Sequence, residues 1–299
     1  MRVKKERLLV IGGSGFIGRN LIEKLRGIYE VTSISRTNQI GNVRNICIDL
    51  IKSDFSFLKE YKGASVAYLG TVSSPKEAEL KPQEAFSSNV TAVQRFLEKS
   101  KELNFKKIIL LSSVVIYASS KQDRLDENGE ISPFSSIYNY SKYLLESLAE
   151  FYRQKHLMPI TVFRLANAYG PFQNTQKVPY LIPSLFQQAL EKGKMEVWNT
   201  TPIRDWVFID DVVEVLSREL QIDGGGIFNL GTGEGRSVGD VARIIASLTN
   251  TSFIDLNRAV EPPYRVVCDI KRLKKRLGYA PSTTLEEGLR KTYNYFKCI

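Results

Sequence analysis

Residues 8–25 read LLVIGGSGFIGRNLIEKL. Four apolar residues, typical of a short buried strand, run directly into a glycine-rich turn, and an amphipathic helix follows. Glycines in such a turn allow close approach of the backbone to a pyrophosphate, and the free N–H groups of the helix N-terminus favour an anion. A turn that only connects strand and helix is the alternative. The context favours a dinucleotide-binding turn formed by Gly12, Gly15, Phe16, Ile17 and Gly18.

The second predicted strand, residues 30–35, bears on the choice of cofactor. An NAD-binding fold usually places a carboxylate after this strand for the ribose 2′-hydroxyl, but Ser35 is followed here by Arg36. An arginine beside a serine suits the 2′-phosphate of NADP through a charge-assisted contact. We therefore expect NADP(H), and NAD stays open if Arg36 is only a solvated loop charge.

Short apolar runs continue along the chain and alternate with helical or loop segments. They lie at residues 43–48, 65–69, 107–111 and 160–165. This alternation predicts an α/β fold, a Rossmann-type doubly wound parallel sheet with helices on both faces. Residues 1–165 are expected to form the dinucleotide-binding domain, to which some later segments return. Residues 166–299, with more prolines and longer loops, are expected to form mainly a smaller α/β C-terminal substrate-binding lobe.

Composition narrows the class of protein. The 299 residues are 43% hydrophobic, which is ample for a sizeable core, and the net charge is +10. The lysines are spread along the chain without interleaved aromatic residues, so we expect attraction for phosphorylated metabolites rather than nucleic acid. No apolar run is long enough to span a bilayer or to serve as an export signal. These features predict a cytoplasmic enzyme without a membrane partner.

Cysteine and histidine give no sign of a metal site. Cys47, Cys268 and Cys298 have neither metal-ligand spacing nor a disulfide framework, and His156 is the single histidine. We expect buried thiols, a surface imidazole and no metal.

Tyr138 and Lys142 lie four residues apart in IYNYSK, on one face of a predicted helix. A cation beside a phenol favours its ionised form and lowers its pKa from about 10, which suits proton exchange with a sugar or alcohol oxygen. The spacing alone also occurs in ordinary exposed helices. Ser113, just after the run 107–111, would bind the same oxygen, unless it is only a strand-end cap.

Motifs along almost the whole chain resemble one family. They are GGSGFIG, the Asp49-Leu50 pair, Asn89, SSVVIY, YNYSK, RLANAYGP, RDWVFIDD, NLGTG and LGYAP. Together they identify the chain as similar to the extended short-chain dehydrogenase/reductase family, in its nucleotide-sugar epimerase, dehydratase and reductase group.

The resemblance implies a catalytic triad of Ser113, Tyr138 and Lys142. Tyr138 would move the proton at the sugar hydroxyl or keto oxygen, and Ser113 would hydrogen-bond that oxygen. Lys142 would bind the nicotinamide ribose and lower the tyrosine pKa. Asn89 would support the sheet rather than relay a proton.

The resemblance also implies further cofactor contacts. Asp49 and Leu50 match positions that line the adenine. Leu69, Gly70 and Thr71 match the segment beside the cofactor, which is usually alanine-rich and here keeps only small size.

Three residues of the C-terminal part match substrate-binding positions of these sugar nucleotide enzymes. Asn167 and Arg204 resemble the residues that contact the diphosphate, for which a guanidinium offers a planar fork. The alternatives are a turn residue and a surface ion pair with Asp205. Trp198 is the candidate for contact with the base, although its loop is one residue shorter than usual and lacks glycines.

Asp210 and Asp211 are interpreted differently, as N-cap and first-turn charges of a helix over residues 212–220.

Val114 and Val115 narrow the reaction. In the 4,6-dehydratases of this group an Asp-Glu pair stands at these positions, and valine cannot transfer a proton. Two reactions remain: reduction of a 4-keto-6-deoxy nucleotide sugar by NADPH, or 4-epimerisation through a transient 4-keto sugar with tightly held NAD. Arg36 favours the reductase. A non-catalytic dinucleotide-sensing protein is a remote alternative, against which the intact triad argues.

A homodimer is the expected assembly. Segments 83–103 and 140–154 correspond to the helices that in relatives pack against their twin as a four-helix bundle. Apolar residues of these segments would feed the interface or face the parent sheet: Phe96, Leu97, Leu144, Leu145, Leu148 and Phe151.

Overall fold

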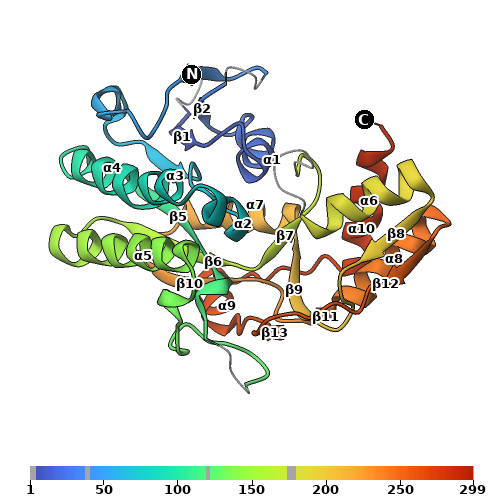
Figure 1. Ribbon diagram of the computed structural model, residues 1–299. Coiled ribbons are helices and arrows are strands. Elements are labelled where there is room, and N and C mark those ends of the chain that lie inside the picture. The colour runs from blue at the N-terminus through green and yellow to red at the C-terminus, as the bar shows by residue number, and fades with distance from the viewer. Residues whose placement is uncertain (1–4, 38–40, 119–121, 174–179, 299) are drawn as a thin grey trace. The chain divides into compact units, whose positions relative to one another are not determined.

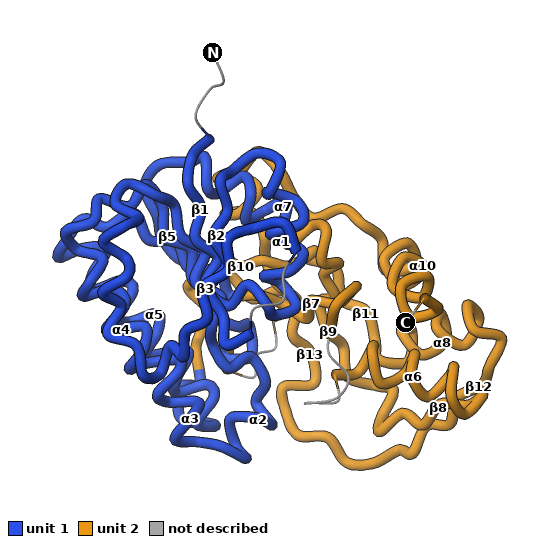
Figure 2. Tube along the Cα trace, turned by 90° about the horizontal axis from the view of Figure 1, so that it is seen from above, with its two compact units in different colours: residues 1–116, 132–164, 213–228 blue, residues 117–131, 165–212, 229–299 orange. Residues whose placement is uncertain are grey.

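The computed structural model describes residues 5–37, 41–118, 122–173 and 180–298. The chain divides into two compact units (Figure 2). Unit 1 comprises residues 1–116, 132–164 and 213–228, and unit 2 comprises residues 117–131, 165–212 and 229–299. The division is thus not a single cut in the sequence, because the chain returns to each unit after leaving it.

Unit 1 contains a seven-stranded sheet with the order β10-β6-β5-β4-β1-β2-β3. The strands are β1 (Arg7–Ile11), β2 (Glu30–Ser35), β3 (Arg44–Cys47), β4 (Ser65–Tyr68), β5 (Lys107–Ser113), β6 (Ile160–Leu165) and β10 (Gly226–Leu230). Strand β1 pairs in parallel with both β2 and β4, so the strand order reverses beside it. Ligands of doubly wound sheets bind at the carboxyl ends of the strands next to such a reversal. The predicted Rossmann-type fold is confirmed.

Helices cover both faces of this sheet (Figure 1). They are α1 (Phe16–Leu25), α2 (Pro75–Leu80), α3 (Pro82–Phe86), α4 (Ala92–Ser100), α5 (Ile137–His156) and α7 (Ile209–Glu219). Helices α4 and α5 lie side by side on one face, where Tyr152 donates a hydrogen bond to Glu98 at 2.8 Å. On the other face, Lys24 of α1 forms an ion pair with Glu214 of α7 at 2.7 Å.

The glycine turn between β1 and α1 is set by close backbone contacts. Gly12 has φ +86°, and a Cβ atom there would lie 2.6 Å from the backbone nitrogen of Gly70. At Gly18 a Cβ atom would lie 2.4 Å from the carbonyl oxygen of Gly12. Both positions therefore exclude other residues, because a side chain at Gly12 would collide with the backbone after β4 and one at Gly18 would push the helix away from the turn.

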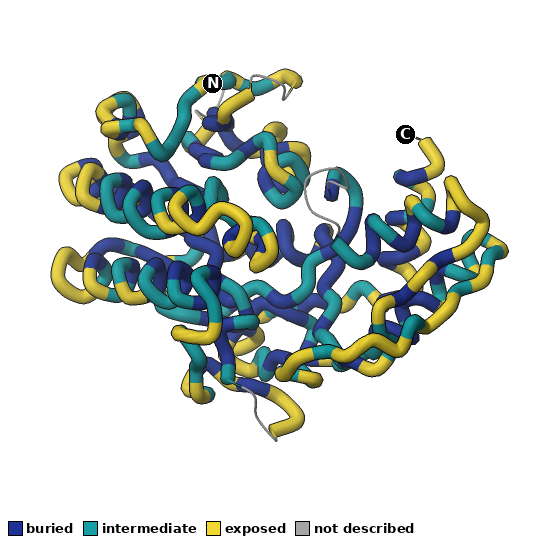
Figure 3. Tube along the Cα trace, in the orientation of Figure 1, coloured by how far each residue is buried: buried dark blue, intermediate teal, exposed yellow. Residues whose placement is uncertain are grey.

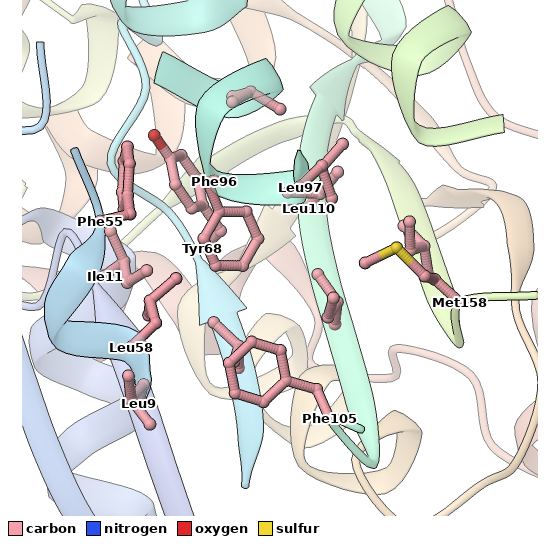
Figure 4. Close-up of a cluster of buried hydrophobic side chains, with 14 of the residues drawn as sticks. Leu9, Ile11, Phe55, Leu58, Tyr68, Phe96, Leu97, Phe105, Leu110 and Met158 are labelled. Carbon is pink, nitrogen blue, oxygen red and sulfur yellow. The ribbon is translucent and has the colours of Figure 1, made fainter. Parts of the chain in front are cut away.

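The main core of unit 1 lies between the sheet and the helices α4 and α5 (Figure 4). Phe96 of α4 is fully buried, with its ring 4.9 Å from Tyr68 and 5.9 Å from Phe55. Leu9 and Ile11 of β1 belong to the same cluster. Burial follows this arrangement, with the strands buried and many loop tips exposed (Figure 3).

Helix α5 carries its functional residues on the face that packs on the core. Its buried positions include Tyr138, Lys142, Leu145 and Ala149, which recur at the helical spacing of three or four residues. The side chain of Ser136 caps the N-terminus by accepting a hydrogen bond from the backbone of Asn139 at 3.0 Å. The same periodicity that buries leucine thus also buries the tyrosine and the lysine.

The segment 83–103 does not form one regular helix. Between α3 and α4 lies a π-helical turn, η2 (Ser87–Thr91), with Asn89 fully buried at its centre. Single π-helical turns often occur at functional sites, because they redirect one side chain out of the regular helical pattern.

Three short 3₁₀ segments complete unit 1. They are η1 (Ser56–Tyr61), η3 (Val114–Ile116) and η4 (Pro133–Ser135).

Unit 2 is built around strand β9 (Ile203–Phe208). Strand β11 (Gly235–Ser237) pairs with it in antiparallel orientation, while β13 (Arg265–Val266) and β7 (Asn167–Tyr169) pair in parallel. A second, parallel pair is formed by β8 (Lys194–Val197) and β12 (Ser252–Asp255). The helices are α6 (Leu181–Lys192), α8 (Val238–Thr249), α9 (Lys271–Leu277) and α10 (Leu285–Phe296). Capping boxes at Ser237 and Thr284 fix the starts of α8 and α10.

Several smaller predictions can be compared with these elements. Cys268 is buried, but Cys47 and Cys298 are exposed, so the prediction of buried thiols is wrong for two of the three. Cys47 lies in β3, at the edge of the sheet, where few neighbours cover it. His156 is exposed at the end of α5, as expected. Among the described residues, no helix is both long and apolar enough to cross a membrane.

The apolar residues considered for a dimer interface differ in burial, and Leu144 is half-buried. Phe96, Leu97 and Leu145 are fully buried in the core of their own unit, so they face the parent sheet. Leu148 is partly buried against that core. Phe151 is 54% exposed, so this side chain is accessible on the outer face of α5.

Candidate active site

The glycine turn forms the first part of the candidate site. The backbone nitrogen of Gly12 donates to the carbonyl of Ile34 at 2.7 Å, which joins the turn to the carboxyl end of β2. Gly15 stands at the N-cap of α1, and Phe16 and Ile17 begin the helix. This places the N–H groups of the first helical turn beside the glycine backbone. A pyrophosphate bound there would accept hydrogen bonds from these groups, and no side chain of the glycines would separate it from them.

Arg36 and Ser35, at the end of β2, both have partners within unit 1. Arg36 has a partner, since its Nη1 lies 3.7 Å from Oε1 of Glu84 in α3. Ser35 is buried, and its hydroxyl donates to the carbonyl of Thr37 at 2.6 Å. Both side chains proposed for the 2′-phosphate are thus engaged within unit 1, Arg36 by a carboxylate and Ser35 by the backbone.

The predicted adenine-side residues meet at the ends of β3 and β4. The carboxylate of Asp49 accepts a hydrogen bond from the backbone of Ile51 at 3.1 Å. The side chain of Leu50 reaches within 2.3 Å of the place where a Cβ atom on Gly70 would stand. Because Gly70 has no side chain, Leu50 packs directly on the backbone that follows Leu69. Leu50 and Gly70 follow strands β3 and β4, so they lie at the carboxyl edge of the sheet, as the glycine turn after β1 does.

Arg95 holds the chain that follows Asp49 and Leu50. Its guanidinium donates to the carbonyls of Ser53 and Ile51 at 3.1 and 2.9 Å. Nothing in the local sequence around position 95 indicates this contact, because donor and acceptors lie more than forty residues apart.

Lys142, one helical turn after the predicted catalytic tyrosine, is held in a defined position by two hydrogen bonds. Its Nζ donates to the hydroxyl of Thr71 and to the carbonyl of Leu111, each at 3.0 Å. The side chain is almost completely buried, and burial lowers the pKa of Lys142 to about 7, while the charge of Glu146 opposes this shift. The amine therefore changes its charge near neutral pH.

Tyr138 lies one helical turn before Lys142, with its ring centre 5.7 Å from the lysine Nζ. The ring packs with Ala78 and Ala85, and its hydroxyl donates to the carbonyl of Ser73 at 3.2 Å. Ser113 is the last residue of β5, and its hydroxyl accepts from the backbone of Val115 at 3.4 Å. All three residues of the predicted triad are thus in unit 1, and Tyr138 and Lys142 both contact the segment 71–73.

Asn89 fixes that segment. Its carboxamide oxygen accepts from the backbone nitrogen of Val72 at 2.7 Å, and its nitrogen donates to the carbonyl of the same residue at 3.1 Å. The nitrogen also donates to the hydroxyl of Ser141 at 3.0 Å. A carboxamide that satisfies both backbone groups of one residue has a positioning role, which agrees with the predicted structural support.

Unit 2 places the predicted substrate residues on and around β9. Asn167 of β7 donates to the carbonyl of Asp205 at 3.3 Å. Arg204 donates through Nη1 to the carbonyls of Ile203 and Tyr264, at 2.9 and 3.1 Å, and burial lowers the pKa of its guanidinium. Asn167 and Arg204 thus approach neighbouring parts of the same strand.

The alternative interpretation of Arg204, a surface ion pair with Asp205, is wrong. Asp205 is fully buried, and its carboxylate accepts hydrogen bonds from the backbones of Thr232, Gly233 and Cys268 at 2.8, 3.0 and 3.2 Å. A Cβ atom on Gly231 would lie 2.5 Å from this carboxylate, which explains a glycine in NLGTG. Consecutive residues of a strand point to opposite faces, so Arg204 and Asp205 diverge.

Asp210 and Asp211 lie in the first turn of α7, which begins at Ile209, so the prediction of an N-cap is wrong and that of first-turn charges is confirmed. The carboxylate of Asp211 also accepts from the hydroxyl of Tyr279 at 2.6 Å and from the backbone of Thr283 at 3.0 Å. The residue therefore anchors the LGYAP segment.

Trp198 is 55% exposed and has a neighbour that the sequence did not suggest. The guanidinium of Arg258 lies 4.5 Å from the centre of its ring, and the indole nitrogen donates to the carbonyl of Ala259 at 3.1 Å. Strands β8 and β12 pair in parallel, which brings the residues that follow them together. The Arg258 guanidinium thus lies over the Trp198 ring, which brings together a cation suited to a phosphate and an aromatic ring suited to a base.

Comparisons with known proteins agree with this arrangement. The profile of the NAD dependent epimerase/dehydratase family matches residues 8–231. The UDP-glucuronic acid decarboxylase 1 of Xenopus tropicalis is 26% identical over 98% of this chain and 72% of its own length. A structure of UDP-glucose 4-epimerase with UDP-glucose, from Thermotoga maritima, has 25% identity and a TM-score of 0.91, and covers 98% of this chain and 99% of that one.

The UDP-glucose 4-epimerase of Thermus thermophilus, in complex with NAD, is also similar. It has 25% identity and a TM-score of 0.86, and covers 97% of this chain and 99% of that one. The resemblance inferred from the motifs is confirmed by the family match.

Proposed function

Because the chain belongs to the NAD-dependent epimerase/dehydratase family, we propose that it oxidises and then reduces C4 of a UDP-sugar, as a nucleotide-sugar 4-epimerase. The observation that carries the proposal is the buried pair of Tyr138 and Lys142, at 5.7 Å between Nζ and ring centre. The epimerase relatives support the choice of reaction.

The residues of unit 1 fit a nicotinamide dinucleotide. The glycine turn leaves backbone N–H groups accessible at the start of α1, and Gly15, at the N-cap of that helix, places no side chain over them. When bound, the nicotinamide supplies the acceptor and donor of the hydride. The protein residues then have to position the sugar oxygen and move its proton.

Tyr138 takes the proton from the C4 hydroxyl and returns it to the keto oxygen. To do so, its hydroxyl exchanges the hydrogen bond to the Ser73 carbonyl for one to the sugar. Ser113, at the end of β5, donates a hydrogen bond to the same oxygen. Lys142 stabilises the ionised phenol by its charge, and uses its third N–H for the nicotinamide ribose. Val114 and Val115 offer no second acid or base, which disfavours dehydration.

The nucleotide half of the substrate is assigned to unit 2. Asn167 and Arg204 would contact the diphosphate, and Trp198 would stack on the base. We add Arg258 to this set, because its guanidinium lies 4.5 Å from the Trp198 ring. The UDP part of the proposal rests on the relatives named above.

A second candidate is reduction of a 4-keto-6-deoxy nucleotide sugar by NADPH, and Arg36 is the observation that favours it. The ion pair with Glu84 weakens this candidate, because the carboxylate, which also pairs with Lys81 at 3.3 Å, offsets part of the charge that a 2′-phosphate would need. We therefore place NAD before NADP, while the sequence alone favours the opposite order.

Two experiments test the proposed function. Denaturation of the purified protein releases any held dinucleotide for identification by mass spectrometry; NAD supports the epimerase, whereas an empty site that prefers NADPH supports the reductase. A panel of nucleotide sugars and their 4-keto forms then tests turnover. Failure of every nucleotide sugar to react, with and without added NAD(H) or NADPH, contradicts both enzymes and favours the dinucleotide-sensing alternative.

A homodimer through α4 and α5 is part of the proposal. Phe151 supports it as an exposed aromatic residue on the outer face of α5. Sedimentation at micromolar concentration tests it, with Phe151→Asp as the variant and Ile254→Asp, on an exposed strand of unit 2, as the control. A monomeric wild type contradicts it.

A further inference from the structure

Thr71 contacts the buried Lys142 directly, although the proposed proton transfer by Tyr138 does not involve Thr71. Lys142 donates through Nζ to the Thr71 hydroxyl and to the Leu111 carbonyl, each at 3.0 Å. An ammonium group has three N–H donors. Because two of them are directed at these acceptors, the direction of the third is also determined.

The backbone that carries Thr71 is itself held in place. Asn89 bonds both the nitrogen and the carbonyl of the next residue, Val72, at 2.7 and 3.1 Å. Its amide also reaches the hydroxyl of Ser141, the residue before Lys142 in α5, at 3.0 Å. Asn89 therefore ties the segment of the threonine to the helix of the lysine, and the distance between hydroxyl and amine is set by a buried side chain.

The charged and titratable groups around Lys142 come from two elements. On α5 these are Tyr138, one turn before, and Glu146, one turn after. From β6, Arg164 engages Glu146 through Nε and Nη2 at 3.0 and 2.8 Å, so much of the Glu146 charge is already paired. Within the described parts of the chain, the contacts from segment 71–73 and β5 are a hydroxyl and carbonyls. Thr71 is thus one of two neutral acceptors, each at 3.0 Å, and the one that belongs to a side chain, for an amine in a setting that disfavours its charge.

We propose that Thr71 is a positioning residue for Lys142, whose hydroxyl holds the amine against the Leu111 carbonyl and favours its protonated form. The inference rests on the proposed function, in which the third N–H of Lys142 meets the cofactor ribose. An acceptor stabilises a charged donor more than a neutral one. Removal of the hydroxyl therefore lowers the lysine pKa and broadens the direction of the remaining N–H.

The test is an NMR titration of the whole unliganded protein labelled with ¹³C at lysine Cε, with Lys142→Met to assign the signal. In Thr71→Val, which keeps the shape of the side chain, we expect the pKa of Lys142 to fall by about 0.5 to 1 unit. Thr71→Ser restores the hydroxyl and the wild-type value. Thr71→Ala serves as a second variant without hydroxyl, should valine impair folding.

The same variants are then titrated with NADH, by fluorescence, between pH 6 and pH 9. The midpoint of the pH dependence should move by the same amount as the lysine pKa, whereas a purely structural role would lower the melting temperature without moving this midpoint. An unchanged lysine pKa in a folded Thr71→Val or Thr71→Ala protein overturns the inference. A shifted lysine pKa in a protein that turns over no nucleotide sugar upholds the contact and overturns the proposed function instead.

Discussion

Lys142 places its Nζ atom 5.7 Å from the centre of the Tyr138 ring, one turn along the same helix. If the phenol is the acid and base, Tyr138→Phe removes the proton transfer and keeps the ring that packs on Ala78 and Ala85. We expect turnover to fall by about 10²- to 10⁴-fold, with NADH affinity nearly unchanged. Steady-state rates and fluorescence titration measure both.

Tyr140→Phe is the matched control for this variant. Tyr140 lies on the same helix, near the exposed ring of Phe134 at 5.9 Å between ring centres. It should keep wild-type rates. Equal turnover by Tyr138→Phe and Tyr140→Phe would show that the Tyr138 hydroxyl does not transfer the proton.

Lys142 also makes stability depend on pH. Burial lowers its pKa to about 7 in the folded protein, while an unfolded chain has about 10.4. Between these values the unfolded state binds more protons, so the contribution of Lys142 to the free energy of unfolding rises with pH by up to about 1.4 kcal/mol per unit. In Lys142→Met no amine titrates at this position, so this pH-dependent contribution to the free energy of unfolding is absent. Its stability relative to wild type should therefore increase as the pH falls towards 7 and then level off.

Urea unfolding between pH 6 and pH 9 measures this difference. Lys155→Met, at the exposed end of α5, is the control and should follow the wild-type curve. Parallel curves for Lys142→Met and wild type would mean that the buried amine does not titrate in this range.

Glu84 should control the choice between NAD and NADP. Its carboxylate lies 3.7 Å from Arg36, so it offsets the charge available to a 2′-phosphate. Glu84→Gln is expected to lower the Kd of NADPH about two- to fivefold, with little change for NADH, because an exposed pair contributes at most about 1 kcal/mol. Arg36→Ala should abolish this gain.

Isothermal titration with both cofactors measures the ratio, and Glu23→Gln on the exposed side of α1 is the control. An equal change for NADH and NADPH after Glu84→Gln would show that the pair does not act on the 2′-position.

Asp205 should matter for stability rather than for chemistry. Its two carboxylate oxygens serve the backbones of Thr232, Gly233 and Cys268. Asp205→Asn turns one acceptor into a donor and leaves buried N–H groups without a partner, which costs about 2–4 kcal/mol. Urea unfolding tests this against Asp210→Asn, whose exposed ion pair with Lys291 at 3.3 Å should contribute at most about 0.5 kcal/mol. Similar losses for both variants would contradict the anchoring role.

Local patterns predicted unit 1 well. The strand, glycine turn and helix of residues 8–25 follow from hydrophobic periodicity and from positions where only glycine fits. The triad was predicted from spacing together with motifs, and α5 places Tyr138 and Lys142 on one buried face. Periodicity suffices here, because the residues that pack are neighbours in sequence.

Other features depend on contacts between distant residues. The break between α3 and α4 accompanies the hydrogen bonds of Asn89 to Val72, which no helical pattern reveals. The same holds for the bond from Lys142 to Thr71, across a separation of 71 residues. The wrong prediction of an ion pair between Arg204 and Asp205 is different, because consecutive residues of a strand point to opposite faces. The strand pattern of residues 203–208 therefore already argued against this ion pair.

The central claim, hydride transfer at C4 within one active site, is tested most directly with UDP-glucose deuterated at C4. Incubation with the protein and its bound cofactor, followed by NMR and mass spectrometry of the UDP-hexoses, reports where the label goes. We predict UDP-galactose that retains deuterium at C4, formed by wild type and not by Tyr138→Phe. Product in which solvent hydrogen has replaced the label at C4 would contradict the account.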